Sequence, residues 1–150
     1  MSTILTSTSA EMTETIGGDL AGRLRGGDVL LLEGDLAAGK TTLVRGLVRA
    51  LDGDGLDVSS PTFVILQSYR CDGGKIESVH HVDLYRLGER ISDLREIGID
   101  EILSEDDAIV AVEWPKDALA TWIPSDARVW RVVITAADDD TRQIEIHPPS

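Results

Sequence analysis

A chain of 150 residues forms one domain, because a domain of this size buries about 70% of its unfolded surface around a single core. Hydrophobic residues make up 42% and charged residues 27%, which excludes a disordered chain. No apolar run reaches the roughly 18 residues of a membrane span, residues 1–14 lack the basic residue of a secretory signal, and Cys71 is the single cysteine. We expect one cytoplasmic domain over residues 1–150, with neither a disulfide nor a membrane segment.

The charge balance restricts the ligands. Asp and Glu total 27 against 14 Lys and Arg, a formal net charge of −13. Such a surface repels phosphate backbones, because affinity for nucleic acids comes mainly from Lys and Arg. We therefore expect no direct binding of DNA or RNA by the isolated chain, and any anionic ligand needs a local pocket of donors.

The first half of the chain predicts a helix, a strand and a second helix. Apolar residues recur every fourth position over 10–24, which indicates an amphipathic helix. The short apolar run 29–33 follows a glycine turn and is typical of a strand buried on both faces. Residues 40–51 again show helical spacing and end at an Asp-Gly repeat.

The second half predicts mainly strands. We expect strands over 58–69, 76–82 and 108–112, and one helix or two short helices over 91–103. A terminal antiparallel hairpin is expected from 129–135 and 143–147, on either side of an Asp triplet. The sequence therefore predicts an α/β fold, in which 29–33, 76–82 and 108–112 are buried central strands of a mostly parallel sheet with an antiparallel portion.

The most specific motif in the sequence is that of a phosphate-binding loop. Residues 34–41 (GDLAAGKT) fit the pattern G-x-x-x-x-G-K-[ST], directly after the strand 29–33 and at the start of the helix 40–51. Glycines let backbone N–H groups turn inward around phosphate oxygens, and the helix start adds further donors. Lys40 would reach the β- and γ-phosphates and the Thr41 hydroxyl would bind Mg²⁺. We expect a three-layer fold like that of the P-loop NTPases.

Two acids are candidates for the metal site that such a loop requires. Asp83 follows one predicted strand and Glu113 follows another. The carboxyl ends of parallel strands meet at one edge of a sheet, so we expect both side chains beside the loop. Which of the two contacts Mg²⁺ directly is left open by the residues themselves.

Four motifs in one order go beyond a generic phosphate-binding loop. Residues 34–42 (GDLAAGKTT), 60–63 (SPTF), 81–86 (HVDLYR) and 113–115 (EWP) together resemble the TsaE family, over about residues 11–125. That family supplies the ATPase component of the bacterial machinery that makes N6-threonylcarbamoyladenosine at position 37 of tRNA. The resemblance implies ATP or ADP and Mg²⁺ as cofactors, and the threonylcarbamoyltransferase subunits TsaD and TsaB as partners.

The resemblance also implies a role for each matching residue. Lys40 would act on the charge of the phosphates, Thr41 and Glu113 would bind Mg²⁺ directly, and Asp83 would orient the attacking water or support the metal. Trp114 would lie beside the site. The resemblance further implies that Thr13 lies near the base. The residues that it places around the phosphates are Asp35, Leu36, Ala37, Ala38, Gly39, Lys40, Thr41 and Thr42.

Four further residues carry weaker predictions. Ala37 stands where the family usually has Gly, and at a position with positive φ it costs about 1 kcal/mol. Thr62 would belong to a switch-like loop or to a plain turn. Arg86 is either a charge stabiliser or an ordinary ion-pair partner. His81 shares a sheet face with Asp83 and is expected to be a hydrogen-bonded support rather than a base.

Three functions compete for these motifs: an ATPase that serves a protein complex, a small-molecule kinase, and a nucleotide-bound scaffold that does not hydrolyse. A kinase normally has an Arg-rich lid, whereas residues 87–107 contain only Arg90 and Arg95 among many acids. We therefore favour an ATPase with weak intrinsic activity that its partners stimulate.

Overall fold

The computed structural model describes residues 2–35, 38–53, 58, 66–72, 74–84, 91–115 and 117–150, with the backbone alone for 91–93. Helices and strands are interspersed along the chain. The elements are β1 (Thr3–Ser7), α1 (Ala10–Ala21), β2 (Val29–Glu33), α2 (Lys40–Ala50), β3 (Leu66–Arg70), β4 (Ser78–Asp83), α3 (Ile91–Glu96), α4 (Ile99–Leu103), β5 (Ala108–Glu113), η2 (Asp117–Thr121), β6 (Val129–Ala136) and β7 (Arg142–His147).

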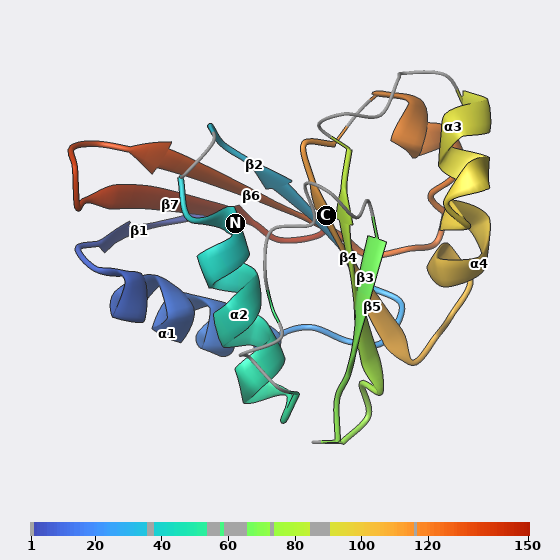
Figure 1. The fold of residues 1–150 in the computed structure, drawn as a ribbon, viewed down its shortest axis with the longest axis horizontal. Coiled ribbons are helices and arrows are strands. Elements are labelled where there is room, and N and C mark those ends of the chain that lie inside the picture. Colours follow the sequence, from blue (N-terminus) through green and yellow to red (C-terminus); the bar gives the residue numbers. More distant parts are fainter. Residues whose placement is uncertain are drawn as a thin grey trace.

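One sheet joins all the described strands, in the order β1-β7-β6-β2-β5-β4-β3 (Figure 1). The four central strands β6, β2, β5 and β4 run parallel to one another, while β7 and β3 run against their neighbours. This confirms the predicted mostly parallel sheet with an antiparallel portion. It also confirms β2, β4 and β5 as its central strands.

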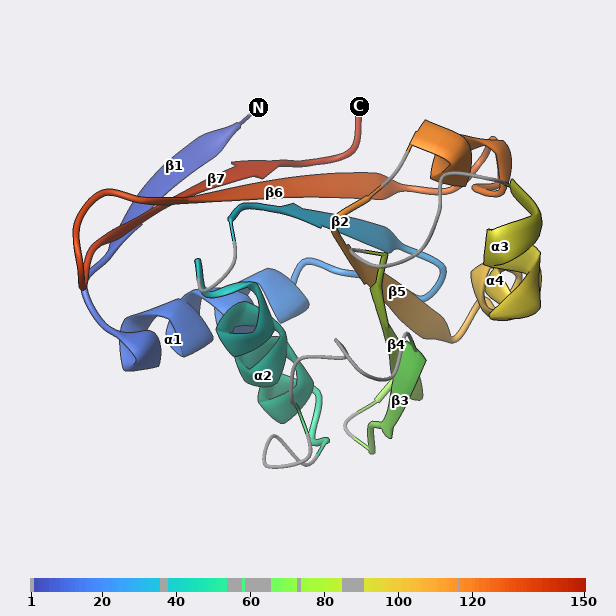
Figure 2. The ribbon, with the colours of Figure 1, turned by 45° about the horizontal axis from the view of Figure 1, so that its top comes forward.

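Helices cover both faces of this sheet, which makes the predicted three layers. Alternate strand residues point to opposite sides. Leu30, Val79 and Ile109 pack in one core with α1 and α2. Val82 and Val110 pack in a second core with α3, α4 and η2. Figure 2 shows α1 and α2 together beneath the sheet and α3 with α4 at its other side.

Two glycines let α1 and α2 pack unusually closely. A Cβ at Gly17 of α1 would lie 2.1 Å from the carbonyl oxygen of Leu43, and one at Gly46 of α2 would lie 1.9 Å from that of Glu14. Any side chain at either position would push the helices apart. Ser9 precedes α1 as its N-cap, and its hydroxyl accepts a hydrogen bond from the backbone N–H of Met12 at 3.0 Å.

The element boundaries differ from the predictions at a few places. The strand expected over 76–82 is β4, Ser78–Asp83, so Asp83 itself is paired in the sheet. The strand expected over 58–69 is wrong at its start, because β3 covers Leu66–Arg70 and Val58 lies outside any strand; residues 59–65 fall outside the described part. Residues 91–103 form the two short helices α3 and α4.

β1 was not predicted. It pairs antiparallel with β7, with Thr3 opposite Ile146, and forms one edge of the sheet. Four of its five residues are exposed, so it lacks the alternating burial that marks a strand in a sequence. Within the described ranges, none of the helices is both long and apolar enough to cross a membrane.

Candidate functional site

The phosphate-binding loop joins β2 to α2, and glycines shape both of its ends. Gly34 has φ 152°, and a Cβ there would lie 2.5 Å from the carbonyl oxygen of Ile134 on β6. Gly39 has φ 107° and is the N-cap of α2, where no described side chain caps the helix and no acid occupies its first turn. The donors at this helix start therefore remain available to an anion.

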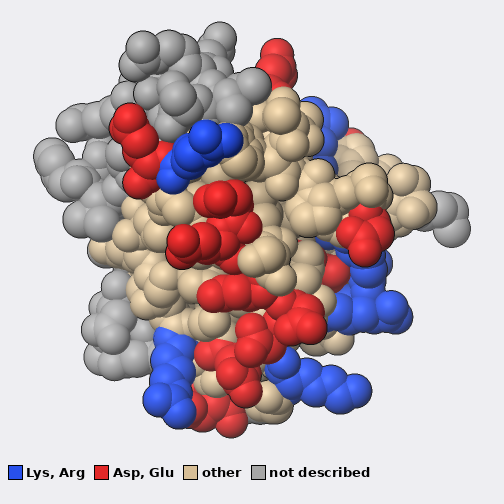
Figure 3. Space-filling view, turned by 90° about the vertical axis from the view of Figure 1, so that its right-hand side faces the viewer, with Lys and Arg blue, Asp and Glu red and all other residues tan. Residues whose placement is uncertain are grey.

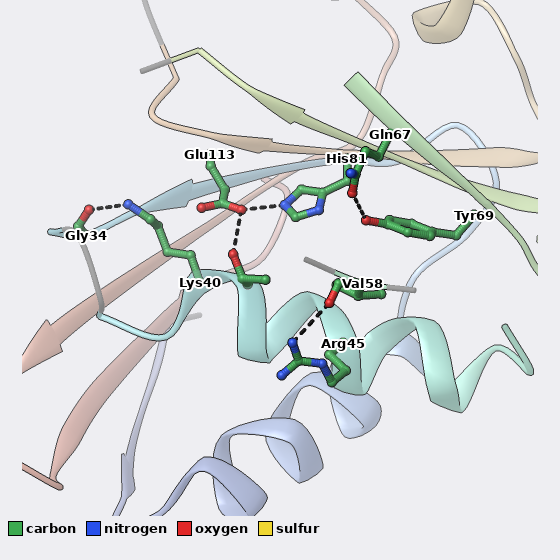
Figure 4. Close-up of polar contacts among 9 residues, drawn as sticks. Gly34, Lys40, Arg45, Val58, Gln67, Tyr69, His81 and Glu113 are labelled. Carbon is green, nitrogen blue, oxygen red and sulfur yellow. Dashed lines mark hydrogen bonds and ion pairs between the residues drawn. The ribbon is translucent and has the colours of Figure 1, made fainter. Parts of the chain in front are cut away.

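Lys40 is the first residue of α2 and is 4% exposed. Its Nζ donates a hydrogen bond to the carbonyl oxygen of Gly34 at 2.5 Å (Figure 4). The same atom lies 3.7 Å from the centroid of the Trp114 ring. Burial lowers the pKa of Lys40, although the carboxylates of Glu113, Asp83 and Asp35 act in the opposite direction. A charged amine with so little water around it is favourable only beside anionic groups.

Trp114 follows β5 and has φ 57°, a conformation that is rare for a bulky residue and costs about 1–3 kcal/mol. The backbone N–H of Trp114 donates a hydrogen bond to the carbonyl oxygen of Leu32 at 3.2 Å, which connects the turn after β5 to the end of β2. The indole ring is thereby held over the amine of Lys40, as a cation–π contact requires. Trp114 therefore contacts Lys40, and its predicted place beside a bound nucleotide stays a prediction.

The two candidate acids end adjacent strands. Asp83 on β4 is the register partner of Glu113 on β5, and both are buried, at 5% and 3% exposed. Thr41 Oγ1 donates to Glu113 Oε2 at 3.2 Å, so the second residue of α2 is already in contact with one acid. The expectation that both acids lie at the same end of the sheet is thus confirmed.

His81 contributes a second contact to the same carboxylate. Its Nε2 is hydrogen-bonded to Glu113 Oε2, and the side chain is completely buried. The prediction of a hydrogen-bonded support agrees with this arrangement. What the sequence could not show is the partner, because it depends on the register between β4 and β5 (Figure 4).

A cavity of about 230 Å³ adjoins the loop on the side of α1. Thr13 borders this cavity although it is only 3% exposed. Its Oγ1 lies within hydrogen-bond distance of Ser7 Oγ, at 2.7 Å. The residues that line the cavity are Ser9, Ala10, Thr13, Ala38, Gly39, Thr42, Asp139, Asp140 and Arg142. Three predicted nucleotide-binding residues besides Gly39 therefore meet here.

Arg142 was missed by the sequence analysis. At the start of β7, its Nε donates to the carbonyl oxygen of Ala38 at 3.1 Å, and its Nη1 donates to the carbonyl oxygens of Asp138 and Asp139 at 3.0 and 3.3 Å. The β6–β7 turn is thus attached to the phosphate-binding loop. No local pattern could have found a contact between residues 104 apart in the chain.

Some predicted residues lie outside the described part of the chain: Leu36, Ala37, Thr62 and Arg86. The cost expected for alanine at position 37 and the roles of Thr62 and Arg86 stay predictions.

Asp35, at the start of the loop, is described, and the residue is exposed. Arg45, one turn beyond Thr41, donates to the carbonyl oxygen of Val58 at 3.0 Å, just before the segment that holds Thr62.

Two described side chains could contribute to a Mg²⁺ site that a nucleotide completes. Among the described residues, no three His, Cys, Asp or Glu side chains are arranged to hold a metal ion. Mg²⁺ usually takes one or two protein ligands and completes its shell with water and phosphate oxygens. Thr41 and Glu113, in contact beside the start of α2, match that requirement.

Comparison with known proteins decides the family. The model of the TsaE family, described as "Threonylcarbamoyl adenosine biosynthesis protein TsaE", matches residues 7–144. The chain belongs to the TsaE family. The resemblance seen in the four sequence motifs is therefore confirmed, and it extends further than the motifs themselves, through β6 and into β7.

Individual TsaE proteins match across species. The chain is 39% identical over 109 residues to that of Mycobacterium tuberculosis (69% of this chain, 63% of that protein). It is 37% identical over 134 residues to that of Bacillus subtilis (89% and 78%), and 40% identical over 148 residues to that of Nostoc (92% and 81%). The chain thus spans less than two thirds of the mycobacterial protein.

A solved structure supports the fold. The chain is similar to the crystal structure of Bacillus subtilis YdiB, with a TM-score of 0.72 and 28% identity, over 100% of this chain and 87% of that one. This likeness spans every described element of the chain, whereas the family model covers residues 7–144.

Proposed function

We propose that this chain binds ATP with Mg²⁺ and hydrolyses it in support of forming the threonylcarbamoyl group on adenosine 37 of tRNA, together with TsaD and TsaB. The observation that carries the proposal is the meeting of two sets of groups. Lys40 and Thr41 begin a helix with no described side-chain cap, and Asp83 and Glu113 face them from the ends of two parallel strands.

Each residue has a distinct task in this proposal. Lys40 exchanges its contact with the Gly34 carbonyl for the phosphate oxygens, and Thr41 and Glu113 bind the metal. Bound Mg²⁺ neutralises the negative charge of the phosphates during transfer. Asp83, next to Glu113 on the neighbouring strand, orients the attacking water by accepting a hydrogen bond from it. Positioning of this kind is the main source of catalysis in phosphoryl transfer.

The chain's charge supports a division of labour with its partners. Figure 3 shows the side of the molecule that carries α3 and α4, where acidic side chains form a band. The first turn of α4 alone contains Asp100 and Glu101. With a net charge of −13 the isolated chain repels the tRNA backbone, so the transferase subunits are proposed to hold the tRNA.

Steady-state phosphate release tests the proposal, with each component of the assembly omitted in turn. We expect slow release by the isolated chain and strong stimulation by TsaD with TsaB, because an arginine supplied by a partner accelerates such reactions by orders of magnitude. Fast release that is indifferent to the partners contradicts the proposed control. A chain that never releases phosphate is a scaffold, and transfer of the phosphoryl group to a small molecule identifies a kinase.

A parallel titration with tRNA tests the charge argument. At physiological salt we expect no measurable binding of tRNA by the isolated chain. Tight binding by the chain alone contradicts the proposal that its partners hold the tRNA.

A further inference from the structure

We propose that His81 is a positioning residue for Glu113, one that fixes a single oxygen of the carboxylate and leaves the other directed at the phosphate-binding loop. This inference rests on the proposed function, in which Glu113 binds Mg²⁺. It adds a requirement that neither the loop nor the acid supplies alone, namely a defined orientation of the carboxylate before the metal arrives.

The sheet register creates the contact. His81 on β4 lies opposite Ala111 on β5, and Glu113 is two residues further along β5 on the same face. The small side chain of Ala111 leaves room for the imidazole to reach toward Glu113. Since His81 is completely buried and Glu113 is 3% exposed, water does not compete effectively for this hydrogen bond.

The hydrogen-bonding roles follow from the chemistry of the carboxylate. Glu113 Oε2 accepts from Thr41 Oγ1 at 3.2 Å and is also bonded to His81 Nε2. Because an ionised carboxylate only accepts, His81 donates through Nε2. Its Nδ1 has no partner among the described residues, and the nearby Tyr69 hydroxyl donates to Gln67 Oε1 at 2.5 Å instead. Among the described residues, the imidazole therefore forms its hydrogen bond with Glu113.

The two donors on Oε2 set the direction of the second oxygen. Figure 4 shows that oxygen turned away from His81 and toward Lys40, on the side where the phosphate-binding loop lies. A carboxylate held in this way loses little freedom when it binds a metal, whereas a freely rotating one must first be ordered. Removing such an outer partner typically lowers metal affinity about 10–100-fold.

The neighbouring histidine offers a matched control. His80 is also buried, at 7% exposed, and also bonds a glutamate through Nε2, but its partner Glu105 lies across the opposite face of the sheet. Its Nδ1 lies 2.7 Å from Ser68 Oγ. Replacing His80 removes a histidine–glutamate contact of the same kind from the same strand without touching the proposed metal site.

The experiment compares His81→Leu, which removes the donor, with His81→Gln, whose amide nitrogen can take the place of Nε2, and with His80→Leu. Mn²⁺ affinity in the presence of ADP is measured by electron paramagnetic resonance. ADP affinity in EDTA and the melting temperature are measured alongside. Should His81→Leu fail to fold, His81→Asn, whose amide is too short to reach Glu113, replaces it.

We expect His81→Leu to lose about 10–100-fold in Mn²⁺ affinity while its ADP affinity in EDTA stays within twofold of the wild type. His81→Gln and His80→Leu should retain Mn²⁺ binding. Unchanged Mn²⁺ affinity in His81→Leu overturns the inference, and so does an equal loss of ADP affinity in EDTA, which marks a purely structural role. A wild-type chain that binds ADP without any metal contribution overturns the proposed function itself.

Discussion

Asp83 and Glu113 are direct register partners at the carboxyl ends of β4 and β5, and Glu113 accepts a hydrogen bond from Thr41 of α2 at 3.2 Å. This contact distinguishes two acids whose roles the strand pattern alone left open. The acid in contact with the helix start is placed to share a metal with Thr41. The other lies one strand away, and in the proposed function it orients the attacking water.

Glu113→Ala is therefore expected to abolish the effect of Mg²⁺ on nucleotide affinity, because it removes a proposed direct ligand. Asp83→Ala should keep that effect and lose hydrolysis, because it removes the group that orients the water. Isothermal titration with ADP, with and without Mg²⁺, measures the first quantity and phosphate release the second. If Glu113→Ala keeps the full Mg²⁺ effect, the metal ligand is Asp83.

Lys40→Ala is expected to abolish hydrolysis and weaken nucleotide binding by about tenfold or more. A hydrogen bond between charged groups contributes about 1.5–3 kcal/mol, and Lys40 is the single cation in the loop motif. Lys75→Ala, at an exposed turn beyond β3, is the control and should leave both quantities unchanged. Equal binding of ADP by Lys40→Ala and the wild type would contradict a contact between Lys40 and the phosphates.

Adjacent glycines of α1 should respond in opposite ways to the same substitution. Gly17→Ala places a Cβ 2.1 Å from the Leu43 carbonyl oxygen and should destabilise the fold by about 1–3 kcal/mol. Gly18→Ala meets nothing closer than 3.5 Å and should be neutral or stabilising by up to about 1 kcal/mol. Urea unfolding of both variants is the measurement, and similar midpoints would contradict the close helix contact.

Cys71 should be nearly unreactive in the folded chain at pH 8. Burial raises the pKa of its thiol to about 11, with smaller contributions from Asp72 and Asp52, against an ordinary value of 9.0. The folded chain then holds about 100-fold less thiolate than the unfolded one below both values, so alkylation should be slower by that factor. Labelling with iodoacetamide, with and without guanidinium, measures it.

The sign of the pH effect on stability follows from the same shift. A pKa raised by folding contributes stability that is complete below pH 9 and is lost as the pH rises toward 11. Cys71→Ala should lack this part of the alkaline loss. If iodoacetamide labels Cys71 in the native chain at pH 8 as fast as it labels the unfolded chain, the burial of Cys71 is contradicted.

The parts of the site that sequence reasoning found are those with local signals. The glycines around 34–41 and the helix that follows form one continuous motif, and two apolar runs that each end in an acid needed only the parallel-strand rule. Both Asp83 and Glu113 could thus be assigned to one edge of the sheet from the order of residues alone. β2 and β5 were equally clear, because both are short apolar runs.

The parts that it missed depend on contacts between distant residues. The bond from Arg142 to the Ala38 carbonyl joins β7 to the loop after β2, and no spacing rule covers it. The partner of His81 depended on the register of β4 against β5, which periodicity does not reveal. β1 was not predicted, because its apolar residues Ile4 and Leu5 are 59% and 37% exposed and do not form the alternating pattern of a half-buried strand.

The pairing of β1 with β7 sets an order for folding during synthesis. β1 lies at the edge of the described sheet beside β7 alone, so its ladder of hydrogen bonds cannot form until residues 142–147 have left the ribosome. Contacts between such distant segments form slowly, because a long loop must close first. Ser7, the last residue of β1, is the hydrogen-bond partner of Thr13. The β1 side of the cavity beside the phosphate-binding loop therefore gains its partner strand only when almost the whole chain has been synthesised.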